Sequence, residues 1–302
     1  MSENANDKCK RLPALRGPGI SCRLEVLPGD RVLDRLNDAA RFGFDAISLP
    51  GRFLNDYLNE LRGCLSDSPL PLVSMSLGFS GSLLSPHKKV REQCRDSFLK
   101  LFDICAELGV NSVNMPPVLV QDNPDRITDP GPYASVEQAQ DALLIEQLPA
   151  LGDQAQKRGL VFLLEPVNRY ESQYLNTVPH AAKLCETLNH DHIGLTCDFF
   201  HMQLEELSIP QSLSKAGKWI KHVHVAENTR VEPGPGSLNF TPGFQTLKEI
   251  GYSGFIELEC RKLSGPAEKV LPNLLSISAD CGSKPKISES ENLELIRITG
   301  SL

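Results

Sequence analysis

The chain has 302 residues, of which 40% are hydrophobic and 23% are charged, with 22 glycines, 22 prolines and a formal net charge of −7 at pH 7. This composition excludes collagen-like, low-complexity and fully disordered proteins, and the acidic balance disfavours nucleic acid as a partner. No run of about 18 apolar residues is present, so we expect no membrane span.

Short apolar runs alternate with amphipathic stretches along the chain, which predicts strands separated by helices. The predicted strands are Ile20–Val26, Ala46–Leu49, Leu72–Leu77, Ser112–Met115, Val161–Leu164, Ile193–Cys197, His222–Val225 and Phe255–Leu258. The predicted helices are Arg31–Phe42, Phe53–Leu65, His87–Leu108, Val136–Arg158, Pro179–Leu188, Ser212–Trp219, Thr241–Ile250 and Pro266–Ile277. Eight such units favour a single closed (β/α)8 TIM barrel, an α/β fold.

An open, doubly wound sheet is the rival architecture, and it is disfavoured by the turn after the first strand. That architecture typically carries a G-x-G-x-x-G turn there, whereas residues 27–31 read LPGDR. We therefore expect a polar leader at residues 1–18, a barrel domain at 19–281 and a C-terminal tail at 282–302. The nine cysteines include no C-x-x-C pair, which is typical of a reducing compartment and indicates a cytoplasmic protein.

Ligand-type side chains end the last four predicted strands. They are Glu165, Asp198, His224 and Glu259, each about one strand–helix unit after the previous one. In a barrel, side chains at the carboxyl ends of strands meet at one rim. Each acid taken alone is explained as a helix cap or as the partner of an arginine. Together, three buried carboxylates beside an imidazole would repel one another unless a cation lay among them.

This mostly oxygen donor set predicts one divalent metal ion. Three carboxylates and a histidine favour Mn2+, with Mg2+ or Co2+ also compatible, and the absence of a thiolate disfavours structural zinc. Two carboxylates flanking a keto sugar can remove a proton on one face and return one on the other. The cation would polarise the carbonyl and stabilise an enediolate intermediate.

The segments LLEPVNRYESQYLNT, LTCDFFHM, HVHVAENTR and GYSGFIELE resemble the sugar isomerase and epimerase superfamily with a xylose-isomerase-like barrel, closest to its ketose 3-epimerases and sugar phosphate isomerases. The resemblance covers residues 160–260. It implies that the four strand-end side chains bind the metal and that Glu165 and Glu259 transfer protons. It also implies that Glu171, His201 and Arg230 contact substrate oxygens.

Each implied substrate contact has a structural alternative. Glu171 can be read instead as the partner of Arg169, His201 as a packing residue at a helix start, and Arg230 as half of a surface salt bridge. His222 and Glu257 lie two residues before metal ligands and therefore on the same strand face. We interpret them as a polar pair beneath the metal, against the alternative of outward-facing or simply hydrogen-bonded residues.

The sequence departs from the family in the run PGPGSLNF, where Ser237 and Asn239 replace the usual His and Asp, and strand two ends SLPGR without an acid. These differences bear on the substrate. The sequence predicts a metal-dependent isomerase or epimerase of a keto sugar or sugar phosphate, without nucleic acid or membrane, with homo-oligomerisation left open. The alternatives are a lyase or dehydratase acting on dehydroshikimate- or inosose-like substrates, an endonuclease IV-type phosphodiester hydrolase, which lacks its extra histidines here, and a non-catalytic binding protein.

Overall fold

The computed structural model describes residues 17–117, 119 and 125–272. Most of the predicted leader 1–18, the end of the predicted barrel domain and the whole predicted tail 282–302 lie outside the described residues. Among the described helices, none is both long enough and apolar enough to cross a membrane.

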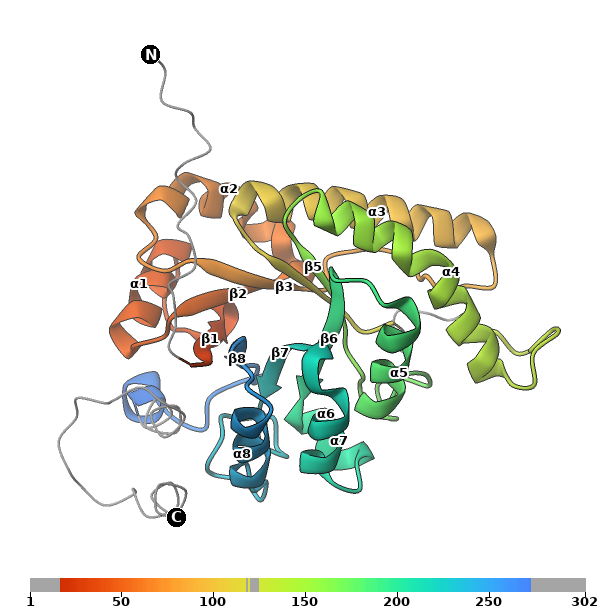
Figure 1. The fold of residues 1–302 in the computed structure, drawn as a ribbon. Coiled ribbons are helices and arrows are strands. Elements are labelled where there is room, and N and C mark those ends of the chain that lie inside the picture. Colours follow the sequence, from red (N-terminus) through yellow and green to blue (C-terminus); the bar gives the residue numbers. More distant parts are fainter. Residues whose placement is uncertain (1–16, 118, 120–124, 273–302) are drawn as a thin grey trace.

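Eight parallel strands close into a barrel in chain order, and the first strand pairs with the last (Figure 1). The strands are β1 (Gly19–Arg23), β2 (Ala46–Pro50), β3 (Leu72–Ser76), β4 (Ser112–Met115), β5 (Val161–Leu164), β6 (Ile193–Asp198), β7 (Ile220–Val225) and β8 (Phe255–Leu258). The predicted closed barrel is confirmed. Only parallel strands joined by right-handed crossovers give this arrangement, so all strand carboxyl ends share one rim.

Helices connect the strands and cover the outside of the barrel (Figure 1). They are α1 (Val32–Phe42), α2 (Leu54–Cys64), α3 (Lys88–Leu108), α4 (Val136–Gln156), α5 (Val178–Leu188), α6 (Phe199–Glu205), α7 (Ile209–Ala216) and α8 (Thr241–Glu249). Residues 267–272 are also helical. Glycines in the left-handed conformation end α1 and α3, at Gly43 (φ 88°) and Gly109 (φ 73°), because a side chain is disfavoured there.

Several predicted boundaries were wrong, and one α-helix was missed. The helix predicted at Ser212–Trp219 lies at Ile209–Ala216, and the strand predicted at His222–Val225 begins at Ile220. The first strand ends at Arg23, and the apolar residues that follow it form a 3-10 turn, Leu24–Val26. Leu24 and Val26 are buried in either conformation, so their apolar character did not distinguish a strand from a turn. Helix α6 was not predicted. It has only seven residues and begins directly at the end of β6, where Asp198 caps it by accepting a hydrogen bond from the Phe200 N–H (2.8 Å).

The two faces of the strands carry different chemistry. Outward-facing side chains join the apolar core between barrel and helices, where Phe98, Phe102 and Phe162 pack edge to face. Inward-facing positions toward the carboxyl rim are polar and buried. They include Ser21, Ser48, Ser74, Ser76, Asn114, Thr196, His222, His224 and Glu257. The barrel interior is therefore lined by buried polar side chains up to the carboxyl rim.

Candidate active site

The structure brings Glu165, Asp198, His224 and Glu259 together at the carboxyl rim. One ligand atom from each side chain lies within 4.8 Å of the others, and all four residues are buried. Burying three carboxylates in one place is unfavourable without compensating positive charge. This group could hold a metal ion, and its convergence is the arrangement expected from the strand-end pattern.

Backbone hydrogen bonds fix where each of these side chains leaves the barrel. Glu165 and Glu259 lie one residue beyond β5 and β8. Their N–H groups still donate to the neighbouring strands, to the Met115 carbonyl (3.1 Å) and the Val225 carbonyl (3.1 Å). Asp198 is the last residue of β6. The strand register thus places the ligand-type side chains at one level of the rim.

Two guanidinium groups balance the carboxylates. Arg230 donates from Nη1 to Asp198 Oδ2 (2.7 Å) and from Nη2 to Glu259 Oε2 (2.6 Å), and its guanidinium lies 4.3 Å from the Phe200 ring centroid. Arg23 donates to Glu259 Oε1 (2.6 Å). Burial alone would raise the pKa of Glu259, but His224 and the two guanidinium groups lower it well below its usual range.

A second buried group lies directly beneath His224. The Nε2 atom of His222 is 2.6 Å from Glu257 Oε2, and the Ser48 hydroxyl donates to the same oxygen (2.5 Å). His224 Nε2 is 3.6 Å from this oxygen, while its Nδ1 is 2.9 Å from Glu165 Oε1 and 3.2 Å from Glu259. His224 therefore presents Nδ1 to the carboxylate cluster and Nε2 to Glu257.

The polar pair predicted from the sequence, His222 and Glu257, is thus hydrogen-bonded and faces the barrel interior. Burial opposes the ionised form of Glu257, but the positive charge of His224 and the hydrogen bond from His222 lower its pKa well below the usual value. Ser48 was not predicted as part of this group. A serine inside a short apolar strand carries no signal of its own, and only the closed barrel brings β2 to Glu257.

Two further donors were missed for the same reason. Asn114, in β4, donates from Nδ2 to Glu165 Oε2 at 2.5 Å. Arg23, at the end of β1, was placed inside a longer strand and given no role. Both side chains lie near the carboxyl ends of their strands, but only the closed barrel shows which carboxylates they meet.

Of the residues implied to contact substrate, Arg230 and His201 lie against the carboxylate cluster, and Glu171 lies beside Asn168. Arg230 lies against Asp198 and Glu259 and is not a surface salt bridge; its side chain is 16% exposed. His201 is buried in α6, and its Nδ1 accepts from the Asn168 N–H (3.2 Å), so its Nε2 faces Asp198 Oδ2 at 3.4 Å. The Asn168 side-chain amide also contacts Glu171 Oε1 (3.1 Å).

The alternative partner of Glu171 is excluded, because Arg169 is paired with Glu205 through Nη2 at 2.8 Å. Asn168, which was not predicted to belong to the site, therefore connects His201 with Glu171. The loop after β7 that departs from the family, PGPGSLNF, is hydrogen-bonded to Glu227. The Glu227 carboxylate accepts from the Gly234 N–H (2.9 Å) and the Leu238 N–H (3.2 Å). Asn239 accepts from the Thr241 N–H (3.2 Å) at the start of α8.

The chain is similar in sequence to known sugar epimerases. Residues 36–279 match the family model described as xylose isomerase-like TIM barrel. The 3-dehydro-D-guloside 4-epimerase of Escherichia coli (strain K12) is 25% identical over 243 residues, which are 79% of this chain and 91% of that protein. A D-psicose 3-epimerase of Ruminiclostridium cellulolyticum is 26% identical over 232 residues, 74% of this chain and 76% of that protein.

Solved structures have the same fold. A 3-keto-D-glucoside 4-epimerase from E. coli matches with a TM-score of 0.74 and 23% identity, covering 86% of this chain and 98% of that chain. A D-psicose 3-epimerase crystallised in the presence of D-fructose matches with a TM-score of 0.73 and 18% identity, covering 88% and 99%. At these identities the structural likeness is one of fold.

Proposed function

The chain belongs to the xylose isomerase-like TIM barrel family, and from that premise we propose that it is a divalent-metal-dependent isomerase or epimerase of a keto sugar. Its relatives of named activity include sugar epimerases, so the resemblance predicted from the second half of the sequence is confirmed. The observation that carries the proposal is the convergence of Glu165, Asp198, His224 and Glu259 within 4.8 Å at the carboxyl rim.

The donor set fits a divalent cation. Three carboxylates and one imidazole are the ligands that Mn2+ accepts, and a 2+ ion would reduce the three negative carboxylate charges to a net charge of about −1. His224 Nε2 and Glu257 Oε1 have no hydrogen-bond partner among the described residues. Metal ligation at Nδ1 would leave the proton on Nε2, facing Glu257. Manganese remains our first choice of metal.

The bound cation would polarise the substrate carbonyl and stabilise the negative charge that develops on the enediolate oxygens. Glu165 and Glu259 are the proposed acid and base, since each keeps one carboxylate oxygen turned toward the cluster, near His224 Nδ1. Their other oxygens are held by Asn114 and Arg23. A carboxylate fixed in this way loses little freedom when it removes or returns a proton.

Ser48, His222 and Glu257 are proposed to position His224. A histidine that binds a metal through one nitrogen commonly donates its other N–H to a carboxylate, which fixes the ring and its tautomer. Glu257 is held on one oxygen by the other two side chains. In this role they would affect metal affinity without touching the substrate.

Glu171, His201 and Arg230 remain the proposed substrate contacts. Arg230 has five N–H donors and bridges Asp198 and Glu259, so a substrate oxygen near the cation would be within its reach. His201 presents Nε2 on the Asp198 side of the same space. Glu171 is held at its edge through Asn168.

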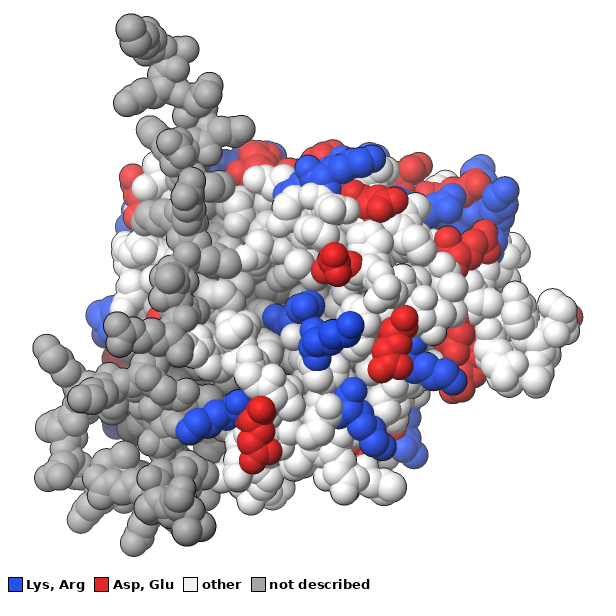
Figure 2. Space-filling view, viewed as in Figure 1, with Lys and Arg blue, Asp and Glu red and all other residues white. Residues whose placement is uncertain are grey.

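A small sugar is the proposed partner. On the face drawn in Figure 2, basic and acidic side chains of the described residues are interspersed, which offers no extended basic surface for nucleic acid. The seven cysteines within the described part of the chain are all unpaired and buried, which supports the cytoplasm as the proposed location. Homo-oligomerisation stays an open prediction.

Solvent proton exchange tests the proposed function directly. The protein is supplied with Mn2+ in D2O and given D-psicose, D-fructose, dehydroshikimate or an inosose, and proton NMR follows the position next to the carbonyl. We expect deuterium to enter a keto sugar together with formation of its epimer or aldose, and EDTA to stop the exchange. Loss of water instead would identify the lyase alternative, and no exchange with any compound would contradict an enediolate enzyme.

A further inference from the structure

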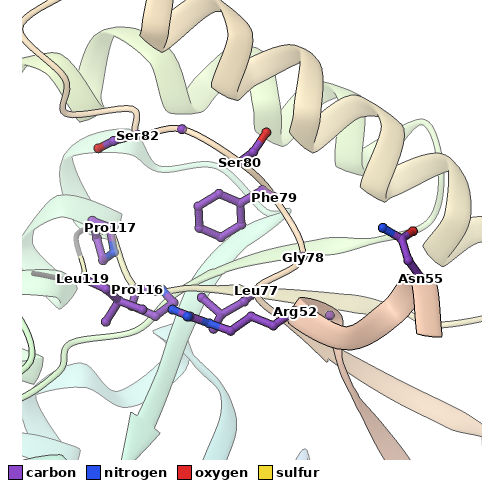
Figure 3. A pocket seen from close by; sticks show the side chains of 12 residues that line it. Arg52, Asn55, Leu77, Gly78, Phe79, Ser80, Ser82, Pro116, Pro117 and Leu119 are labelled. Carbon is purple, nitrogen blue, oxygen red and sulfur yellow. The ribbon is translucent and has the colours of Figure 1, made fainter. Parts of the chain in front are cut away.

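A cavity of about 360 Å³ lies at the carboxyl ends of β2, β3 and β4, on the other half of the rim from the proposed metal ligands. Figure 3 shows the loops after these three strands around it. The described residues that line it do not include any of the four proposed ligands. Any role for this cavity in substrate binding rests on the proposed function, because the cavity belongs to the same rim.

Tight backbone packing builds the floor of this cavity. A Cβ atom on Gly51 would lie 2.7 Å from the Leu77 carbonyl oxygen and 2.8 Å from the Gly78 Cα, so only glycine permits the two loops to touch. Leu77 itself has φ of 65°, a conformation that a non-glycine residue adopts at a cost of about 1 kcal/mol or more. Strain of this kind is maintained where surrounding structure enforces it, often at ligand sites.

The strained turn presents Phe79 to the cavity (Figure 3). One face of this ring is stacked on Phe98, with centroids 4.3 Å apart and planes at 25°. The polar side chains in the lining are Arg52, Asn55, Ser80 and Ser82, and no carboxylate is among the described lining residues. A fixed aromatic ring bordered by hydroxyl, amide and guanidinium groups is suited to a sugar ring, which has C–H faces and a hydroxyl edge.

Two hydrogen bonds connect the cavity with the proposed active site. The Leu77 N–H donates to the Asn114 carbonyl (3.1 Å), and the Asn114 side chain donates to Glu165 (2.5 Å). The cavity floor is therefore adjacent to Glu165, so a substrate longer than the carboxylate cluster has this half of the rim to extend into. The cavity volume is in the range that holds a drug-sized ligand, more than the three carbons left over from a six-carbon ketose need.

We propose that this cavity binds a second sugar ring, joined by a glycosidic bond to the keto sugar that reacts. The substrate is then a keto glycoside, with its reacting ring at the carboxylate cluster and its second ring against Phe79. The competing occupant is the open-chain tail of a free ketose. It has no ring face to stack on Phe79, so it predicts equal Kd values for probes with and without a second ring.

The test compares two probes with the same reacting ring, methyl 3-keto-β-D-glucoside and 3-keto-cellobiose oxidised on its non-reducing ring. Calorimetry of the Mn2+-supplied full-length protein gives Kd for each. We expect about a tenfold lower Kd for the disaccharide, equivalent to about 1.4 kcal/mol. Phe79→Leu keeps an apolar side chain against Phe98 but removes the flat ring, and should abolish that preference while leaving the methyl glycoside unchanged.

Phe42→Leu is the matched control, because Phe42 is buried at the end of α1, on the opposite side of the barrel from the carboxyl rim. It should change neither Kd, and thermal unfolding checks that both variants fold. Equal Kd values for the two probes in the unaltered protein, or equal weakening of both by Phe79→Leu, would overturn the proposal. Absence of solvent exchange with these probes and with free ketoses would contradict the proposed function, whereas the Kd comparison would still decide whether the cavity binds the second ring.

Discussion

The two halves of the barrel contribute different chemistry to the same rim. Strands β5–β8 provide the carboxylates and the imidazole of the proposed metal site. Strands β1, β2 and β4 provide the donors that hold carboxylates of that half, namely Arg23, Ser48 and Asn114. The first half also forms the cavity around Phe79. In the proposed function, the second half supplies the metal ligands, the acid and base and the contacts Glu171, His201 and Arg230, while the first half supplies supporting donors and the cavity.

This division has a physical reason. A buried carboxylate is unfavourable unless donors surround it. Here Arg23 and Asn114 come from strands directly paired with those of Glu259 and Glu165, because β1 pairs with β8 and β4 with β5. Changes to the proposed acid and base in the second half should therefore abolish chemistry, while changes to the supporting donors and the cavity in the first half should weaken metal or substrate binding. Substitutions in each half test this contrast, and the largest effect is expected in the second half.

Glu165→Gln should cause the largest loss. The amide cannot accept a proton from carbon, and it is a poorer metal ligand, so solvent exchange into a keto sugar should fall by about 100- to 10,000-fold. Proton NMR in D2O measures the rate. Glu249→Gln, on the exposed end of α8, is the control and should leave the rate unchanged. Activity retained by Glu165→Gln would refute its role as acid or base.

Ser48→Ala should act on metal affinity. It removes one of two donors to Glu257 Oε2, so His224 is held less firmly, and the Kd for Mn2+ should rise about tenfold. Ser74→Ala is a matched control, because Ser74 is also buried in the barrel and its hydroxyl has no hydrogen-bond partner among the described residues. If both variants bind Mn2+ equally well, Ser48 does not position the site.

A pair away from the ligand cluster should affect stability only, and weakly. His180 Nε2 lies 2.8 Å from Asp141 Oδ1, and this hydrogen bond raises the pKa of His180 against the effect of burial. The charged pair therefore stabilises the fold fully below the ordinary histidine pKa, and the contribution disappears as pH rises through the raised value. His180→Gln should lower the free energy of unfolding by about 0.5–1 kcal/mol at pH 6 and by less at pH 9.

Denaturant unfolding at both pH values measures this difference. A loss that is the same at pH 6 and pH 9 would mean that packing against Tyr174, whose ring centroid is 5.6 Å away, matters more than the charge. Solvent exchange by the variant should match the unaltered protein. A large loss of activity in His180→Gln would contradict the prediction that this pair affects stability only.

The sequence predicted the fold and the proposed ligands well because both depend on regular spacing. Strand–helix alternation indicates a parallel barrel, and Glu165, Asp198, His224 and Glu259 recur once per unit at strand ends. His222 and Glu257 followed from the two-residue period of a strand. These signals are local, and each can be read without knowing which strands are neighbours.

The partners of these residues could not be predicted in the same way. Ser48 and Glu257 are 209 residues apart, and Arg23 and Glu259 are 236 apart. Their contacts exist only because β1 closes the barrel against β8 and because side chains cross its interior. Asn168, which joins His201 to Glu171, lies in an irregular loop where no periodicity indicates direction. Long-range pairing, rather than residue type, decided these roles.

Joint binding of one cation by side chains from β5 to β8 is the claim on which the proposed function depends. Calorimetric titration of the metal-stripped, full-length protein with Mn2+ tests it most directly, in parallel with Asp198→Asn. We predict about one ion bound per chain and loss of measurable binding in the variant. Failure of the unaltered protein to bind Mn2+, Mg2+ or Co2+, or equally tight binding by the variant, would contradict this claim.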